Sequence, residues 1–185
     1  IKNVGLNSTR TGFYQLLKNC GAKIKFKNLK KNNNEYRGNI IVASSNLKPI
    51  TASKKYYVNS TDEYPILFII AALTKGTSTF KGIGDLANKE SNRIVEMKKI
   101  LDQIKVKSKI SKNELKIYGQ GMIDASNLKV DVPNLGDHRI CMSAFILALL
   151  TGAKTKIKNF ETVFTSSPSF LLIMKSLGAK FEIQK

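Results

Sequence analysis

Cysteine is scarce, with two residues in 185, and tryptophan is absent. Cys20 and Cys141 both lie in apolar, helix-like surroundings, which indicates reduced core thiols and excludes a disulfide framework. No apolar run approaches the ~20 residues of a membrane-spanning helix, and the N-terminal residues lack the apolar stretch of a secretory signal. The chain begins at Ile1 without a Met, which is typical of a fragment. These absences favour a cytoplasmic protein with no membrane partner.

Acidic residues are also few, since 13 Asp and Glu accompany 31 Lys and Arg, for a net charge of +18. An anionic partner, such as nucleic acid or a phosphorylated metabolite, would suit that charge. A compositional bias toward lysine on solvated surfaces also explains it, and is favoured because the lysines are spread along the whole chain. No block of basic residues alternates with aromatic ones, so nucleic acid is not the expected partner.

Arginine and histidine are scarcer still. Only four arginines stand among the many lysines, and the single histidine, His138, directly precedes Arg139. Where lysine is the usual cation, a retained arginine such as Arg93 indicates a task that needs a planar guanidinium. Bidentate binding of a carboxylate or phosphate is such a task.

A helix followed by a short strand recurs along the chain. In each copy the apolar residues of the helix fall at i, i+3, i+4 and i+7, and a turn separates helix from strand. This pattern predicts helices at 11–20, 91–104 and 168–177, followed by strands at 21–26, 106–110 and 178–183.

A second recurring unit begins with an acidic residue. Asp62 and Asp137 each open a uniformly apolar helix, which ends at a glycine and leads into a strand. Helices this apolar should be buried on most sides. The predicted helices are 66–73 and 140–150 and the strands are 77–80 and 155–157, with a further strand at 115–118 and a loop at 30–34.

Joined together, these elements predict an α/β fold of repeated βαβαββ units. Two units cover most of the chain, and a partial unit precedes them. No linker rich in Pro, Gly or Ser divides the sequence, so residues 1–185 are expected to form a single domain.

Three polar clusters stand at or just before predicted helix starts, where free N–H groups and the positive end of the helix dipole favour anions. Lys89, Arg93 and Arg139 would supply a phosphate or carboxylate pocket. Asp62 and Glu90 beside these cations are candidates for proton transfer. The clusters span residues 61–63, 89–93 and 136–139.

Each cluster also has a purely structural interpretation. Asp62 and Asp137 could serve only as helix N-caps. The spacing of Lys89, Glu90 and Arg93 could give ion pairs on a solvated helix face, and a lone histidine is more often structural than catalytic. Recurrence at equivalent places in repeated units favours a functional site.

The same segments resemble those of a known family, the 5-enolpyruvylshikimate-3-phosphate (EPSP) synthases. The match to the family's signature segments is in the right order and at plausible spacing, and it runs nearly end to end. The matching segments are DEYPIL at 62–67, NKESNR at 88–93 and DHRICMS at 137–143, with NSTRTG at 7–12 and TSSPSF at 165–170.

Members of that family transfer the enolpyruvyl group of phosphoenolpyruvate to the 5-hydroxyl of shikimate 3-phosphate and release phosphate, a step of aromatic amino acid biosynthesis. They use no metal and no organic cofactor. The resemblance implies the same two substrates as partners. It also implies a fold of two globular halves, each an inside-out α/β barrel of three βαβαββ units. The chain resembles the C-terminal half.

The resemblance also implies residue roles. Asp62 matches the acceptor of the proton from the attacking hydroxyl, and Glu90 matches a carboxylate that protonates the phosphoenolpyruvate methylene. Two anionic substrates imply that cations outnumber acids in the site. The substrate-binding residues implied are Lys89, Arg93, His138 and Arg139.

Some positions depart from the family pattern. The usual Arg-Val before the Lys-Glu pair is Ala87-Asn88, and the usual Asp before the last arginine is Asn92. Thr165 stands where many members have a lysine that helps to bind phosphoenolpyruvate, and Ser167 replaces an aromatic residue. These departures bear on substrate affinity, whereas the residues matched to the chemistry are all present.

The family enzyme is more than twice as long as this chain. Its N-terminal half supplies most contacts to shikimate 3-phosphate, together with a lysine and an arginine for phosphoenolpyruvate. That half, or a complementing chain, is therefore an expected partner, and the isolated chain is expected to be nearly inactive.

Other functions stay open at this point. UDP-N-acetylglucosamine enolpyruvyl transferases share the fold, but they rely on a loop cysteine, and neither Cys20 nor Cys141 is expected in such a loop. An RNA-binding or RNA-processing module of related βαβαββ units would use the +18 charge, and its affinity would fall steeply with salt. A degenerate paralogue would bind anions and do no chemistry.

Overall fold

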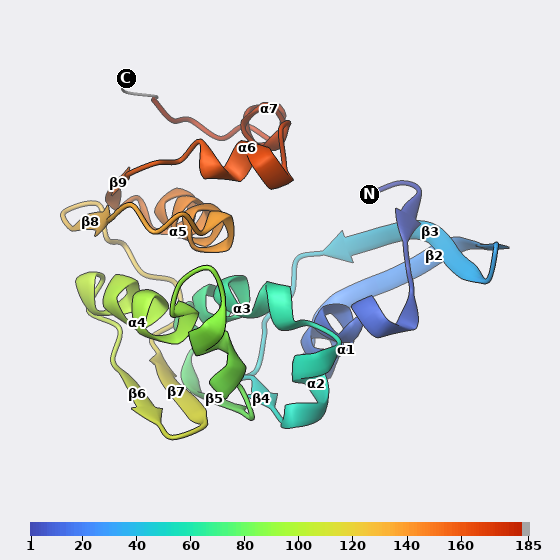
Figure 1. Ribbon diagram of the computed structural model, residues 1–185, viewed down its shortest axis with the longest axis horizontal. Coiled ribbons are helices and arrows are strands. Elements are labelled where there is room, and N and C mark those ends of the chain that lie inside the picture. The colour runs from blue at the N-terminus through green and yellow to red at the C-terminus, as the bar shows by residue number, and fades with distance from the viewer. Residues whose placement is uncertain (183–185) are drawn as a thin grey trace.

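The structure is a computed structural model that describes residues 1–182, and Figure 1 shows its elements. Within those residues no helix is long and apolar enough to cross a membrane. The strands are β1 (Val4–Gly5), β2 (Lys23–Asn32), β3 (Glu35–Ala43), β4 (Thr51–Ala52), β5 (Gly76–Lys81), β6 (Ser108–Ser111), β7 (Glu114–Gly119), β8 (Lys129–Val132) and β9 (Lys154–Ile157). The helices are α1 (Gly12–Asn19), α2 (Lys54–Val58), α3 (Tyr64–Ala72), α4 (Arg93–Gln103), α5 (His138–Thr151), α6 (Thr162–Ser166) and α7 (Phe170–Ser176), with 3₁₀ turns η1 (Ser8–Arg10), η2 (Thr61–Glu63) and η3 (Gly84–Asn88).

Three small sheets carry the predicted repeat. The middle unit is complete, because β4 pairs in parallel with β5, and β5 continues through antiparallel β7 to β6. The first unit contributes the matching order β1-β3-β2, also antiparallel, and the third contributes the parallel pair β8-β9. The chain order of the middle unit is β4-α3-β5-α4-β6-β7, which confirms the predicted βαβαββ unit.

The core forms where the two most apolar helices meet. α3 packs against α4, α5 and β7, and it buries residues on all its sides, including Leu67, Phe68 and Ile69. Pro65 stands in the first turn, where its missing N–H costs nothing. Gly152 ends α5 in the left-handed conformation, with φ 72°. The prediction that the apolar helices are buried on most sides is confirmed for α3, whereas α5 leaves Leu149 and Leu150 exposed near its C-terminal end. Figure 1 shows α3 between α4 and α1.

Both cysteines are free and buried, as predicted. Cys20 caps the C-terminal end of α1, and Cys141 lies in the first turns of α5. Burial raises the pKa of the Cys141 thiol to about 11, and the nearby Asp137 carboxylate adds to that effect. Neither thiol is in a loop of the kind that a catalytic cysteine would need.

Two of the predicted elements are wrong. Residues 30–32 continue β2 and do not form a loop, because they pair with β3 across a two-residue turn at Asn33 and Asn34. Both turn residues have positive φ, which asparagine tolerates in tight hairpins. The strand expected at 178–183 does not form at 178–182, where Phe181 instead packs against Phe145, and residue 183 lies outside the described residues.

One buried hydroxyl is a local defect in this core. Tyr64 is 0% exposed and its ring packs edge-on against Phe68 and Phe80, but its hydroxyl has no hydrogen-bond partner among the described residues. We expect Tyr64→Phe to raise the free energy of unfolding by about 1 kcal/mol, since it removes an unpaired polar atom and keeps the ring. Urea unfolding measures this. Tyr56→Phe is the matched control, because the Tyr56 hydroxyl accepts a hydrogen bond from Asn19 and its loss should not stabilise. A loss of stability on Tyr64→Phe would contradict the expectation.

Candidate active site

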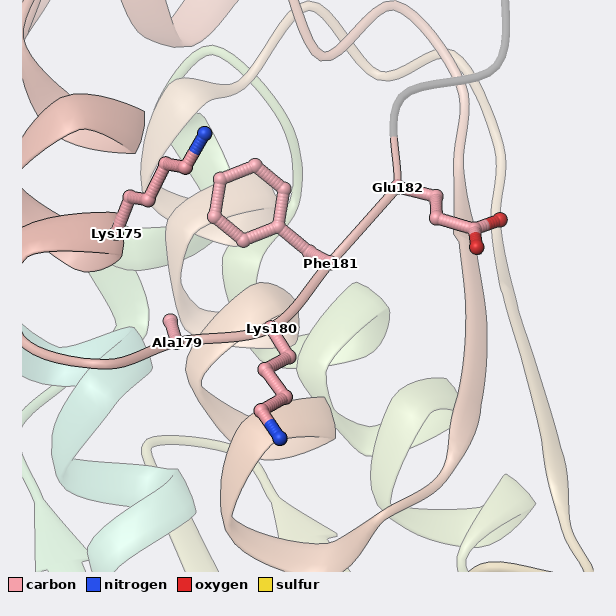
Figure 2. Close-up of a pocket in the computed structure, with 5 residues that line it drawn as sticks. All are labelled: Lys175, Ala179, Lys180, Phe181 and Glu182. Atoms are coloured by element: carbon pink, nitrogen blue, oxygen red, sulfur yellow. The ribbon is translucent and has the colours of Figure 1, made fainter.

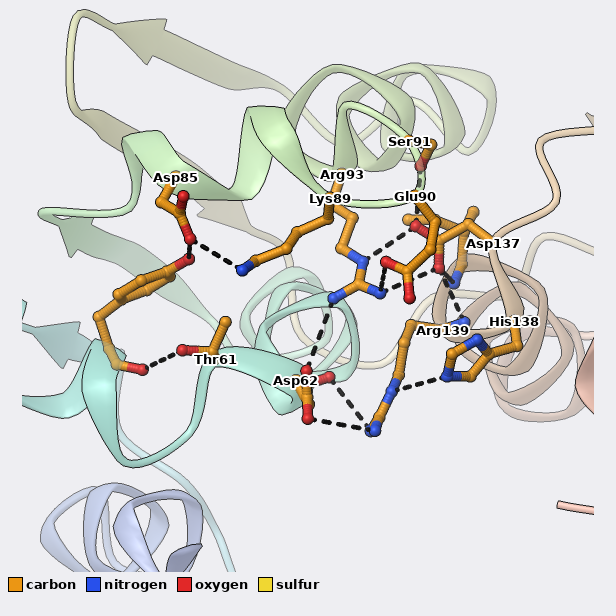
Figure 3. Close-up of polar contacts among 12 residues, drawn as sticks. Thr61, Asp62, Asp85, Lys89, Glu90, Ser91, Arg93, Asp137, His138 and Arg139 are labelled. Carbon is orange, nitrogen blue, oxygen red and sulfur yellow. Dashed lines mark hydrogen bonds and ion pairs between the residues drawn. The ribbon is translucent and has the colours of Figure 1, made fainter. Parts of the chain in front are cut away.

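The N-terminal ends of α3, α4 and α5 converge, and they bring the three predicted polar clusters together (Figure 3). These segments are separated by tens of residues in the sequence and meet because their helices pack on one another. All six predicted site residues lie in or beside this cluster. They are Asp62, Lys89, Glu90, Arg93, His138 and Arg139.

Arg93 is the centre of the cluster and is 1% exposed. Its Nε lies 2.9 Å from Oδ2 of Asp137, its Nη2 lies 2.5 Å from Oε2 of Glu90, and its Nη1 lies 3.8 Å from Oδ1 of Asp62. The guanidinium is therefore surrounded by carboxylates that come from all three helix starts. A buried charge needs such partners, since desolvation would otherwise expel it.

Asp137 is fully buried, and its carboxylate bonds both to residues at the start of α4 and to the backbone at the start of α5. One oxygen accepts hydrogen bonds from the Ser91 hydroxyl and from Arg93, each at 2.9 Å. The other accepts from the backbone N–H of Arg139 at 3.0 Å and caps α5. Burial acts to raise the pKa of Asp137, but the hydrogen bonds and charge of Arg93, with those from Ser91 and Arg139, outweigh it and hold the pKa below its usual value.

The carboxylate of Asp62 contacts three arginines. Its Oδ2 lies 3.1 Å from Nη2 of Arg10 and 3.3 Å from Nη2 of Arg139, and its Oδ1 faces Arg93. The side chain is 29% exposed, so one edge of the carboxylate reaches solvent. The alternative that Asp62 is only an N-cap is wrong, because Glu63 precedes α3 and no side chain caps that helix.

The other interpretations of the clusters also have clear outcomes. Asp137 is an N-cap, as that interpretation proposed, but it is a buried partner of Arg93 as well. The interpretation that Lys89, Glu90 and Arg93 form ion pairs on a solvated helix face is wrong, because Lys89 and Glu90 precede α4 and Arg93 is buried. His138 accepts a hydrogen bond at Nε2 from Nε of Arg139, at 3.1 Å, and so helps to orient that guanidinium.

Lys89 points away from Arg93 and toward η3 (Figure 3). Its Nζ lies 2.8 Å from Oδ2 of Asp85, which also accepts a hydrogen bond from the Tyr57 hydroxyl at 2.8 Å. Lys89 and then Tyr57 hold the pKa of Asp85 below its usual value. Burial, followed by the contact with Asp85, raises the pKa of Tyr57.

Glu63 adds a half-buried carboxyl next to Asp62. Burial raises its pKa, the charge of Arg139 opposes that rise, and the charge of Asp62 adds to it. The cluster thus holds acids of different character, since the pKa of Asp137 is lowered and the pKa of Glu63 is raised. Such divergence among neighbouring carboxyls is typical of sites that move protons.

Cations do not outnumber acids among the described residues of this cluster. Four cations, Arg10, Lys89, Arg93 and Arg139, are ion-paired with four carboxylates. The carboxylates are Asp62, Asp85, Glu90 and Asp137. The physical reason is that guanidinium groups drawn partly out of water are neutralised by the chain's own acids.

Arg10, Asp85 and Tyr57 are members of the cluster that the sequence does not predict. Arg10 lies 52 residues before Asp62 and Tyr57 lies 28 before Asp85, so no local spacing joins them. The only signal for Arg10 was its place in the NSTRTG segment and its rarity as an arginine.

A hollow on the surface lies apart from this cluster. It is lined by Lys175, Ala179, Lys180, Phe181 and Glu182, at the end of the described chain (Figure 2). Phe181 packs edge-on against Phe145, with ring centres 5.2 Å apart, and so covers the small aromatic cluster beneath α6 and α7. No residue of the polar cluster lines this hollow.

The fold and the cluster at its helix starts define an enolpyruvyl transferase-like α/β protein. A solved structure of the enolpyruvyl transferase NikO from Streptomyces tendae matches with a TM-score of 0.61 over 92% of this chain and 36% of that one; at 13% identity it shows the fold alone. EPSP synthase from Acinetobacter baumannii matches with a TM-score of 0.90 and 29% identity over 100% of this chain and 42% of that one. The family model described as EPSP synthase (3-phosphoshikimate 1-carboxyvinyltransferase) matches residues 1–174. The chain belongs to the EPSP synthase family.

Curated relatives agree with this assignment. The 3-phosphoshikimate 1-carboxyvinyltransferase of Paramagnetospirillum magneticum is 34% identical over 97% of this chain and 40% of its own length. That of Zymomonas mobilis is 35% identical over 99% of this chain and 41% of its own length. The resemblance inferred from the sequence is thereby confirmed, and the chain spans about 40% of the length of these relatives.

Proposed function

We propose that this chain forms one wall of an active site that transfers the enolpyruvyl group of phosphoenolpyruvate to the 5-hydroxyl of shikimate 3-phosphate. The observation that carries the proposal is the partly exposed Asp62 carboxylate, held by three arginines at the junction of three helix starts. A carboxylate fixed in this way can accept a proton, while the arginines beside it can hold an anionic substrate. Family membership supplies the reaction.

Anion binding would rearrange the ion pairs of the cluster. Arg93 and Arg139 are the proposed ligands of phosphoenolpyruvate, with His138 orienting Arg139 through its 3.1 Å hydrogen bond. Arg93 is already occupied by Glu90, so an incoming carboxylate or phosphate would take the place of Glu90 on the guanidinium. Lys89 would leave Asp85 to contact shikimate 3-phosphate, since its side chain is 29% exposed.

That exchange would prepare the proton transfers. Glu90, freed from Arg93, would carry a proton and deliver it to the methylene carbon of phosphoenolpyruvate, which leaves a cationic centre at the adjacent carbon. The 5-hydroxyl oxygen would bond to that carbon while Asp62 takes the hydroxyl proton. Glu90, now a carboxylate, would take a proton back from the new methyl group while the carbon–oxygen bond to phosphate breaks, which releases phosphate and restores the double bond. Guanidinium groups in a cleft with little water stabilise the charges that develop.

The remaining assignments complete the proposal. Residues 1–185 would form one domain, opposite a second wall supplied by the rest of a longer protein or by a complementing chain. The reaction would need no metal or organic cofactor and would take place in the cytoplasm. Nucleic acid is not a proposed partner, because Arg10, Arg93 and Arg139 all contact carboxylates of the cluster.

A titration followed by amide NMR tests the proposal. With phosphoenolpyruvate at moderate salt, we expect shifts at Asp62, at residues 89–93 and at His138 and Arg139. Arg139→Ala should weaken the affinity about tenfold or more, since it removes a charge-assisted bidentate donor. A short RNA is the parallel ligand. Diffuse shifts with RNA and none with phosphoenolpyruvate would overturn the proposal in favour of an RNA-binding module.

A further inference from the structure

Arg10 occupies a position in the first unit that corresponds to the start of α4 in the middle unit. The sheet orders β1-β3-β2 and β5-β7-β6 are equivalent. In each unit a 3₁₀ turn followed by a helix connects the first strand to the next strand along the chain, β1 to β2 and β5 to β6. In the first unit these are η1 and α1, and in the middle unit they are η3 and α4. Arg10 ends η1, and Arg93 begins α4. The repeat thus delivers an arginine to the same cluster twice.

The backbone around Arg10 is held against the segment that carries Asp62. Asn7 caps η1 by accepting a hydrogen bond from the N–H of Thr9 at 3.0 Å. The N–H of Gly12 donates to the carbonyl of Asn59 at 3.2 Å. A Cβ at residue 12 would lie 2.8 Å from the Cβ of Asn59, so only glycine permits this approach. These contacts fix the backbone of Arg10 close to the segment that carries Asp62.

Of the three arginines that contact Asp62, Arg10 has the fewest polar partners. It is 65% exposed and lies 3.1 Å from Oδ2 of Asp62, the same oxygen that Arg139 contacts at 3.3 Å. Arg93, in contrast, is buried and faces three carboxylates. Arg10 thus shares its single carboxylate oxygen with a second guanidinium, and an exposed ion pair of this kind is weakly held.

We propose that Arg10 is a further substrate-binding residue, which joins Arg139 in holding a carboxylate or phosphate group of the substrate above Asp62. The proposal rests on the proposed function and adds a ligand from the first repeat. On binding, the Arg10 guanidinium would turn from Asp62 to the anion, so that the Asp62 carboxylate loses one partner as it becomes the proton acceptor. An arginine suits this task, because its planar fork binds either anion through two hydrogen bonds.

The test compares two exposed arginines in the 185-residue chain. Arg10→Ala and Arg37→Ala remove the same charge, but Arg37 lies on β3, away from the cluster. In NMR titrations with phosphoenolpyruvate we expect Arg10→Ala to raise the dissociation constant about fivefold to tenfold and Arg37→Ala less than twofold. Arg10→Lys should restore part of the affinity. Inorganic phosphate and pyruvate, titrated separately, distinguish the two groups: the one whose affinity falls on Arg10→Ala is the group that Arg10 binds.

The outcomes separate this inference from the function on which it rests. Equal effects of Arg10→Ala and Arg37→Ala, with binding by the wild type and its loss on Arg139→Ala, would overturn the role of Arg10 alone. Absence of phosphoenolpyruvate binding by the wild type would overturn both proposals. Because the Arg10 pair is exposed, the urea midpoint of Arg10→Ala should stay at the wild-type value, which excludes general unfolding as the cause of weaker binding.

Discussion

Asp137→Ala is expected to lower the free energy of unfolding by about 3–5 kcal/mol, because it leaves the buried Arg93 without its closest fully buried partner. Asp137 is 0% exposed, it lies 2.9 Å from Nε of Arg93, and it caps α5. Glu90 and Asp62 stay near the guanidinium, but Glu90 is 46% exposed and Asp62 lies 3.8 Å away. Urea unfolding followed by circular dichroism measures the effect. Asp137→Asn keeps the shape of the side chain and should lower the free energy of unfolding less than Asp137→Ala does.

Asp102→Ala is the matched control for that loss. Asp102 pairs with Lys98 at 2.7 Å on the exposed side of α4, where water screens both charges. We expect a change within about 0.5 kcal/mol there, although the distance is shorter than that between Asp137 and Arg93. A loss on Asp137→Ala as small as that on Asp102→Ala would contradict the view that burial makes this ion pair structurally necessary. Adding Arg93→Met to Asp137→Ala should recover part of the loss, since it removes the unpaired charge.

The same carboxylate predicts how stability depends on pH. The pKa of Asp137 is lowered in the folded state, so its contribution is fully present above the unfolded pKa of about 3.9. That contribution is lost as the pH falls below this value and through the folded pKa. We expect Asp137→Asn to lose less stability than the wild type between pH 4 and pH 2, when each is compared with its own value at pH 7. Parallel profiles for the two proteins would contradict this assignment.

The repeated elements could be predicted because their signals are local. Glycine at residue 152 is sufficient to indicate where α5 ends, but the apolar run at residues 140–150 overstates its burial, since Leu149 and Leu150 are exposed. The hairpin at Asn33 and Asn34 was missed because a lysine- and asparagine-rich segment is usually a loop. Here both asparagines adopt positive φ, which allows β2 and β3 to pair on either side of them.

The candidate site could be predicted only as a set of residues. The clusters at the starts of α3, α4 and α5 could be found because each stands before an apolar or amphipathic helix. Their pairing could not, because it depends on how three helices pack. The sequence predicts that Arg93 binds a substrate anion. In the structure Arg93 is buried and contacts three carboxylates of the chain itself. Both descriptions hold if substrate anions replace carboxylates on the arginines, as proposed here.

The 185-residue chain alone should give no measurable turnover with phosphoenolpyruvate and shikimate 3-phosphate. If the described residues provide only one wall of the proposed site, a bound phosphoenolpyruvate would not be oriented against shikimate 3-phosphate. Orientation of two reactants is worth an effective concentration of about 10⁵–10⁸ M, and its loss removes most of the rate. A phosphate-release assay measures this, with the intact Zymomonas mobilis relative as the positive control. Turnover by the isolated chain at a rate near that of the relative would contradict the prediction.

Restoring the second wall should restore the chemistry and expose the role of Asp62. In a chimera, this chain would replace the matching 41% of the Zymomonas mobilis relative, to which it is 35% identical. We expect phosphate release by the chimera, and a fall in kcat of about 10²–10⁴ on Asp62→Asn, since the amide cannot accept the hydroxyl proton. Asp102→Asn, on the exposed face of α4, is the control and should leave kcat unchanged. If Asp62→Asn lowered the affinity for phosphoenolpyruvate and left kcat intact, Asp62 would be an organiser of the arginines and not the proton acceptor.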